Sequence, residues 1–121
     1  MIKSSADMVT ETRKEMRGGR GEINIAHIFA KEEMRSKCRI FARIEIKPGC
    51  SIGTHEHVDE EEIYYVIKGS GTVNDNGTIR KLSAGDAVIT GGGESHSIEN
   101  TGEEPLEMIA AVLLFPEESK P

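Results

Sequence analysis

The sequence predicts an all-β protein whose strands form a sandwich or a closed barrel. Short segments rich in β-branched and aromatic residues alternate with Gly, Pro, Asn and Asp turn signals along most of the chain. Helical periodicity is almost absent. The 121 residues suffice for one domain with one core, and closure of a sheet is the usual way to remove its edges. We therefore expect about eight to ten short strands in a single domain.

The N-terminal region divides into an expected arm and a first expected strand. Residues 1–21 mix charged residues with three glycines, and a helical turn at 12–16 is their only periodic feature. From residue 22 to residue 29, apolar and polar side chains alternate, which is typical of a half-buried strand. We therefore predict an N-terminal arm at 1–21, followed by a barrel domain that covers 22–115.

The rest of the barrel domain is expected to consist of short strands separated by turns. The expected strands cover residues 38–46, 62–68, 72–74, 78–82, 86–90 and 96–100. The dipeptide Asn76-Gly77 lies between two of these strands and is one of the strongest short-range hairpin signals. Residues 106–115 form the longest apolar run, which we place deep in the sheet or at a subunit contact. Residues 116–121 are expected to form a polar tail.

The composition argues against nucleic acids and membranes as partners. The formal net charge of −6 does not suit a nucleic-acid surface, because such a surface needs clustered Lys and Arg. One basic segment exists, but Glu15 interrupts it and Glu22 follows it, so we expect it to be solvated. Its members are Arg13, Lys14, Arg17 and Arg20. No apolar run approaches the ~20 residues that a bilayer-spanning helix needs.

The two cysteines predict a reducing compartment rather than a disulfide framework. Cys38 lies in an apolar run and Cys50 follows a Pro-Gly turn, so both are expected to be small packing residues. The sequence also begins without the apolar segment that is typical of a secretory signal. We therefore expect a soluble protein of the cytoplasm.

The histidines predict a metal site. His55 and His57 are two residues apart, so both imidazoles leave the same face of an extended strand and can meet one ion. Glu61 or Glu62 can supply a third ligand, and His96 is the candidate for the fourth. Imidazole and carboxylate together suit a divalent transition metal, and this ligand set does not distinguish Mn, Fe, Co, Ni, Cu and Zn.

The spacing of these residues resembles the two sequence motifs of the cupin superfamily. The first motif, G(x)5HxH(x)3-4E(x)6G, fits the segment from Gly49 to Gly69 throughout. The second, G(x)5PxG(x)2H(x)3N, fits the segment from Gly85 to Asn100 with one departure, since Gly91 stands where the family has proline. The resemblance implies a double-stranded β-helix, also called a jelly-roll barrel. It also implies one metal ion inside the barrel, with one or two coordination positions left for water or substrate. The implied ligands are His55, His57, Glu62 and His96.

The choice between Glu61 and Glu62 is open on strand parity alone. Alternation makes Ile63, Tyr65 and Ile67 the apolar face of their strand, and Glu61 shares that face. The cupin motif instead selects Glu62, six residues before the closing glycine. We follow the motif, because both faces of the sheet can be buried in a small barrel, and keep Glu61 as the second choice.

Other side chains near the expected metal are candidates for acid-base or orienting roles. Tyr64 shares a strand face with Glu62, and Glu94 lies near the expected glycine loop, so these two are our candidate catalytic residues. Weaker candidates are Thr90, His27 and Arg43. The remaining acids near the histidines are expected to be solvated loop residues, although a metal-bound histidine often needs a hydrogen-bond acceptor behind it. These acids are Glu56, Asp59 and Glu60.

The resemblance leaves three hypotheses for function. The first is a small-molecule metalloenzyme of the oxygenase, isomerase or lyase type, whose oxygen-rich substrate chelates the metal. The second is a binding module that captures a small carboxylate or a sugar without turnover. The third is a structural barrel with an empty or incidental metal site. The apolar run at 106–115 and the glycine-rich arm further predict a homodimer.

Overall fold

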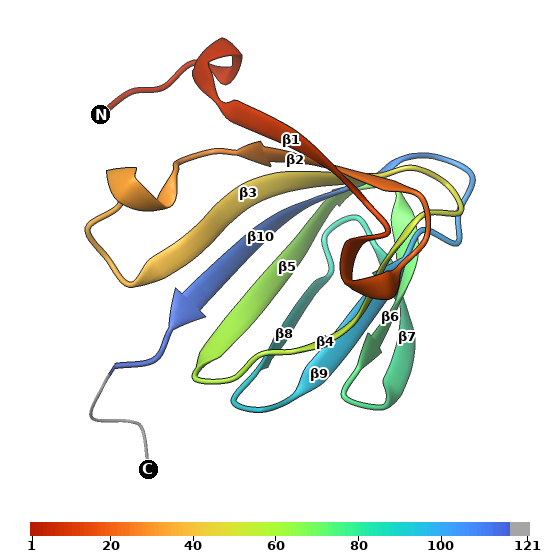
Figure 1. The fold of residues 1–121 in the computed structure, drawn as a ribbon. Coiled ribbons are helices and arrows are strands. Elements are labelled where there is room, and N and C mark those ends of the chain that lie inside the picture. The colour runs from red at the N-terminus through yellow and green to blue at the C-terminus, as the bar shows by residue number, and fades with distance from the viewer. Residues whose placement is uncertain (117–121) are drawn as a thin grey trace.

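The computed structural model describes residues 1–116, and nearly all of the polar tail expected at 116–121 lies outside these described residues. The described chain contains ten strands and three short 3-10 helices (Figure 1). The strands are β1 (Val9–Lys14), β2 (Glu22–His27), β3 (Cys38–Ile46), β4 (Ser51–Glu56), β5 (Glu60–Lys68), β6 (Ser70–Asp75), β7 (Thr78–Ser83), β8 (Ala87–Gly91), β9 (Ser95–Glu99) and β10 (Leu106–Leu114). The 3-10 helices are η1 (Ser5–Asp7), η2 (Met16–Gly18) and η3 (Lys31–Glu33).

The strands form two antiparallel sheets that face each other. The larger sheet has the order β1-β2-β3-β10-β5-β8, and the smaller has the order β4-β9-β6-β7. Figure 1 shows the two sheets facing each other as a barrel, with η2 lying in front of β4. Strands far apart in sequence therefore pair with each other, as β3 does with β10 and β4 with β9. This arrangement confirms the expected all-β jelly-roll barrel.

The long apolar run of the sequence lies deep in the larger sheet. Strand β10 is hydrogen-bonded to β3 on one side and to β5 on the other. Every second side chain of β10 from Leu106 to Val112 is buried, and those between them are only partly exposed. Of the two placements expected for this run, the central position in the sheet is the one found.

Strand β5 presents a polar face to the barrel interior. Its buried side chains are Glu60, Glu62, Tyr64 and Val66. The opposite face is turned outward, and Tyr65 and Ile67 on it are 46% and 38% exposed. Alternation of apolar residues therefore gives the wrong inner face for this strand, because the interior at this point consists of charged and polar groups.

The N-terminal segment adds a strand that the sequence did not predict. Strand β1 pairs with β2 along its whole length, from Val9 opposite His27 to Lys14 opposite Glu22. The helical turn expected at 12–16 is wrong, since the chain is extended as far as Lys14 and η2 begins only at Met16. The limits of an arm, a barrel domain and a tail stay predictions, but the expected arm supplies the edge strand of the larger sheet.

Two local expectations agree with the structure, namely the hairpin turn and the unpaired cysteines. Asn76 and Gly77 connect β6 to β7 with φ values of 50° and 98°, as a tight hairpin turn requires. Cys38 and Cys50 are both free thiols. Within residues 1–116, no helix has the length and apolar character needed to cross a membrane.

Candidate metal centre

Four side chains from both sheets meet inside the barrel. His55 on β4 lies directly opposite His96 on β9, so the two imidazoles are cross-strand neighbours in the smaller sheet. His57 follows β4 by one residue, and Glu62 reaches the same point from β5 in the larger sheet. One ligand atom from each of these four residues lies within 4.8 Å of the others. The structure thus brings together the four residues selected by the motifs, and Glu62 rather than Glu61 is the carboxylate among them.

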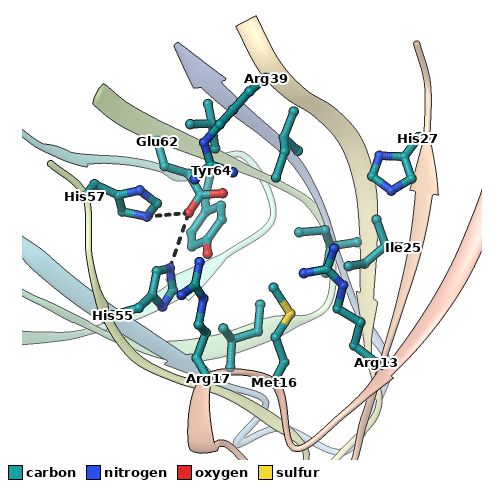
Figure 2. A pocket seen from close by; sticks show the side chains of 14 residues that line it. Arg13, Met16, Arg17, Ile25, His27, Arg39, His55, His57, Glu62 and Tyr64 are labelled. Carbon is teal, nitrogen blue, oxygen red and sulfur yellow. Dashed lines mark ion pairs between the residues drawn. The ribbon is translucent and has the colours of Figure 1, made fainter. Parts of the chain in front are cut away.

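The distances within this cluster suit a metal ion. The Nε2 atom of His96 lies 3.0 Å from Nε2 of His55, from Nε2 of His57 and from Oε1 of Glu62. The same Glu62 oxygen lies 3.0 Å from Nε2 of His57 and 3.7 Å from Nε2 of His55, and Figure 2 marks these last two ion pairs. With bonds of about 2.1 Å, two ligand atoms at right angles around a metal lie about 3.0 Å apart. The four atoms therefore have the mutual spacing that one transition-metal ion requires.

The hydrogen bonds behind two imidazoles direct their lone pairs at the centre of the cluster. His55 Nδ1 lies 2.8 Å from the carbonyl oxygen of Gly53, which can only accept, so Nδ1 carries the proton. His57 Nδ1 likewise faces a carboxylate oxygen of Glu60. In a neutral ring the other nitrogen, Nε2, is then an unprotonated acceptor. Two such acceptors and the Glu62 oxygen repel one another unless a positive charge sits between them, so the residues present fit a divalent cation.

Glu60 and Arg39 support His57 from behind. Glu60 is 9% exposed and accepts hydrogen bonds from Arg39 Nε and Nη2, both at 2.7 Å. The guanidinium of Arg39 lowers the pKa of Glu60 despite its burial, so the carboxylate stays ionised beside His57. The expectation that Glu60 is a solvated loop acid is therefore wrong. The buried position of Glu60 could have been predicted from the sequence, because Glu60 and Glu62 are two residues apart on one strand and therefore share a face.

The pKa shifts in the cluster also favour a positive charge at its centre. Burial alone would raise the pKa of Glu62, but the three imidazoles that face its carboxylate outweigh burial and hold the pKa well below its usual range. The hydrogen bond that a protonated His57 would donate to Glu62 raises the pKa of His57, against the opposing effect of burial. A proton or a metal ion is thus drawn to the space that these groups share, and metal binding must displace protons.

Tyr64 lies against the cluster. Its ring stacks on the imidazole of His96, with centroids 5.0 Å apart and an angle of 8° between the planes. Burial and the negative charge of Glu62 raise the pKa of its hydroxyl well above the usual value, so the phenol is protonated at neutral pH. Tyr64 lines the same pocket as the expected ligands.

The other catalytic candidate, Glu94, is placed differently. Its side chain is exposed in the turn before β9, outside the lining of the pocket, and its carboxylate accepts from the N–H of Gly91 at 3.3 Å. Its carbonyl oxygen accepts from the backbone N–H of His57 at 3.0 Å, while Gly93 N–H donates to the His57 carbonyl at 2.8 Å. In this structure, Glu94 holds the His57 loop through its backbone.

Two of the three weaker candidates lie away from the pocket. Thr90 donates to Asp75 at 2.6 Å, and Arg43 pairs with Glu107 at 2.7 Å on the outer side of the larger sheet. His27 does line the pocket, with its Nε2 2.5 Å from a Glu11 oxygen.

Gly91 accounts for the single departure from the second motif. A Cβ at this position would lie 2.4 Å from the carbonyl oxygen of Glu60 and 2.5 Å from Cα of Glu61. The backbone of β5 passes so close that only glycine fits. Glycine in place of the family's proline therefore allows β8 to pack closely on β5, next to the Glu60 and Glu62 side chains.

A small pocket opens from the cluster toward the N-terminal segment (Figure 2). Its volume is about 80 Å³, enough for two or three water molecules at about 30 Å³ each. One wall consists of His55, His57 and Glu62 together with Tyr64, and the opposite wall comes from β1, η2 and β2. The residues of this second wall are Arg13, Met16, Arg17, Ile25 and His27.

Comparison with known proteins agrees with this geometry. Residues 42–112 match the family described as the cupin domain. The oxalate-binding protein of Thermotoga maritima is 46% identical over 115 residues, which make up 95% of this chain and 95% of that protein. A crystal structure of a predicted oxalate decarboxylase from Thermotoga maritima has a TM-score of 0.90 at 46% identity, covering 95% of this chain and 100% of that one.

A more distant structure shares the fold alone. This is a cupin 2 conserved barrel domain protein from Rhodopseudomonas palustris, with a TM-score of 0.73 and 15% identity over 92% of this chain and 77% of that one. The family match covers more than half of the chain, and the Thermotoga relative matches nearly all of it. Both findings confirm the resemblance seen in the two motifs. The chain belongs to the cupin family.

Proposed function

We propose that this protein binds one divalent transition metal through His55, His57, Glu62 and His96, and that a small carboxylate ligand chelates the bound metal. The observation that carries the metal site is the convergence of unprotonated imidazole nitrogens on a buried carboxylate oxygen, at spacings of 3.0 to 3.7 Å. Four protein ligands leave coordination positions open for a ligand when the ion takes five or six.

The size of the pocket supports a very small ligand. A volume of about 80 Å³ is well below the 300–1,000 Å³ of pockets for drug-sized molecules, so a sugar fits this space poorly. The relative from Thermotoga maritima is named an oxalate-binding protein, and oxalate offers two carboxylates on only two carbons. Oxalate is therefore the first ligand to test.

The proposal is tested by metal analysis and calorimetry. Untagged protein is expected to contain close to one equivalent of a transition metal, and the metal-loaded protein is expected to bind oxalate with a stoichiometry of one. Protein stripped by a chelator should lose oxalate binding and regain it when manganese is restored. Substoichiometric, scattered metal would support a structural barrel instead, and oxalate binding that survives stripping would contradict chelation.

A second candidate function is a lyase, favoured by the protonated hydroxyl of Tyr64 in the pocket wall. Decarboxylation of oxalate breaks its C–C bond, and one proton joins the carbon to give formate and carbon dioxide. The bound metal supplies the electronic activation of the substrate, and Tyr64 would hold the proton. Formate production by metal-loaded protein that Tyr64→Phe abolishes, with oxalate binding retained, would establish this function. Binding without formate after prolonged incubation favours the binding module.

We also propose a homodimer and a cytoplasmic location. Exposed apolar side chains on the outer face of β5 and β8 support self-association, namely Tyr65, Ile67 and Ile89. A monomer in analytical ultracentrifugation at micromolar concentration would contradict the dimer. The two free cysteines suit a reducing compartment.

A further inference from the structure

Three arginines line the pocket, and two of them are already neutralised. Arg39 pairs with Glu60 through two hydrogen bonds of 2.7 Å. Arg13 pairs with Glu11 at 2.7 Å, and the same carboxylate also contacts His27. These cations are therefore balanced within the wall of the pocket.

Arg17 differs from the other two. No acidic side chain within residues 1–116 forms an ion pair with it, although it lines the same pocket. Figure 2 shows its guanidinium pointing from η2 toward His55 and Tyr64. Its positive charge also acts on the Tyr64 hydroxyl, where it opposes the increase in pKa. Arg17 thus presents an unbalanced charge to the space beside the metal centre.

Close backbone packing fixes Arg17 in this position. A Cβ at Gly53 would lie 2.1 Å from the carbonyl oxygen of Arg17, and a Cβ at Gly19 would lie 2.1 Å from that of Ser51. The two glycines therefore let η2 rest directly on β4, while Met16 packs against the core. Arg17 itself has φ 55° and ψ 31°, a left-handed conformation that non-glycine residues rarely adopt. Such strain persists only where surrounding contacts maintain it.

The charges that remain in the pocket favour a dianion. Metal binding requires neutral imidazoles, so the carboxylate of Glu62 offsets one of the two charges of a divalent ion. Arg17 adds a second uncompensated positive charge. A small dicarboxylate balances both charges, whereas a monocarboxylate leaves one unbalanced and a neutral ligand leaves two.

We propose that Arg17 makes this site select small dicarboxylate dianions over monoanions of the same size. This inference rests on the proposed function, since the ligand must first chelate the metal. The planar guanidinium pairs with the carboxylate oxygens that the metal leaves free, in the fork geometry that suits arginine better than lysine.

The test compares two chelating ligands of similar size on the manganese-loaded protein. Oxalate carries two negative charges, and glycolate carries one, with a hydroxyl in place of the second carboxylate. Calorimetry at constant ionic strength measures both ligands on the wild type, Arg17→Gln, Arg17→Lys and Arg20→Gln. Arg20 is the matched control, because it lies in the same segment but is exposed and pairs with Glu99 at 2.7 Å. Metal content is measured for each variant.

Arg17→Gln is expected to weaken oxalate binding by about tenfold or more and glycolate binding by less than about threefold, with one metal equivalent retained. Arg17→Lys should recover part of the loss, and Arg20→Gln should change neither ligand. Equal losses for both ligands, or unchanged oxalate binding in Arg17→Gln, would overturn this inference alone. If the metal-loaded wild type binds no oxalate, the proposed function fails and this inference fails with it.

Discussion

The two walls of the pocket are built in different ways. The first wall consists of His55, His57 and Glu62 together with Tyr64, from β4, the residue after it and β5, and these side chains are almost fully buried. The fourth expected ligand, His96 on β9, contacts them within the cluster. The opposite wall belongs to β1, η2 and β2, and its two arginines, Arg13 and Arg17, are exposed. It contains positive φ values at Glu15 and Arg17. The first wall is thus buried and fixed by hydrogen bonds behind its imidazoles, and the second is exposed and contains a strained backbone.

This difference suggests a division of labour between the walls. A metal ion needs ligand atoms held in fixed positions, which paired strands and buried hydrogen bonds provide. Recognition of a ligand needs access to solvent and tolerance of small movement, which an edge hairpin provides. Changes in the first wall should therefore alter metal affinity, and changes in the second should alter ligand choice or local stability.

The largest effect is expected from His96→Ala. This substitution removes the nitrogen that lies 3.0 Å from each of the other three ligand atoms, so metal affinity should fall more than about 100-fold. Competition with a fluorescent chelator measures the loss. His27→Ala is the matched control, because His27 is in the second wall, and it should retain one metal equivalent. Equal metal content in the two variants would remove the distinction between the walls.

The next largest effect is expected from Glu60→Gln. The amide can still accept from Arg39 but no longer presents a charge to His57 Nδ1, so metal affinity should fall by about 10- to 100-fold. Glu61→Gln is the control, since Glu61 is the next residue on β5 and lies outside the ligand cluster. The same chelator competition measures both variants, and a loss that is equal in both would show that Glu60 does not orient His57.

The first wall is also the one that the sequence predicted well. The expected metal ligands occur at the fixed spacings of the two motifs, and the pairing of β4 with β9 places His55 opposite His96, as the motifs imply. The selection of Glu62 came from motif spacing. Alternation failed on β5 because it assumes an apolar interior, whereas the inner face here carries Glu60, Glu62 and Tyr64.

The second wall could not be predicted in the same way. The sequence assigned Arg17 to a solvated basic segment, and its charge pattern gave no sign of the pocket. Its position depends on tertiary contacts, since η2 rests on β4 only where Gly19 and Gly53 leave room for the backbone. Strand β1 was missed because its side chains are mostly exposed and lack the alternation that reveals a half-buried strand.

A smaller effect is expected from Gly53→Ala, which tests how the walls are joined. The added methyl group would meet the Arg17 carbonyl at 2.1 Å, so η2 must shift, and the free energy of unfolding should fall by about 1–3 kcal/mol. Gly53 also accepts from His55, so metal affinity should fall modestly. Urea denaturation measures the stability, with Thr54→Ala as the control because the Thr54 side chain is exposed. Unchanged stability in Gly53→Ala would show that η2 is not seated on β4 as described.

The smallest effect is expected from Glu11 in the second wall. The hydrogen bond from Arg13 lowers the pKa of Glu11, with a further contribution from His27, against a small opposing effect of burial. A carboxyl group with a lowered pKa stabilises the fold above its unfolded pKa of about 4.3, and that contribution is lost as the pH falls through the folded value. Because the group is partly exposed, solvent screening limits the contribution to less than about 1 kcal/mol.

Glu11→Gln should therefore be slightly less stable than the wild type at pH 7, and the difference should shrink as the pH falls below about 4. Urea denaturation of both proteins across this range measures it, with exposed Glu32→Gln as the control for the loss of one negative charge. A difference that stays constant with pH would mean that Glu11 acts through packing rather than charge. In that case the ion pair with Glu11 would not neutralise Arg13. Arg13 and Arg17 would then both present positive charge to the pocket, and the contrast between them would be lost.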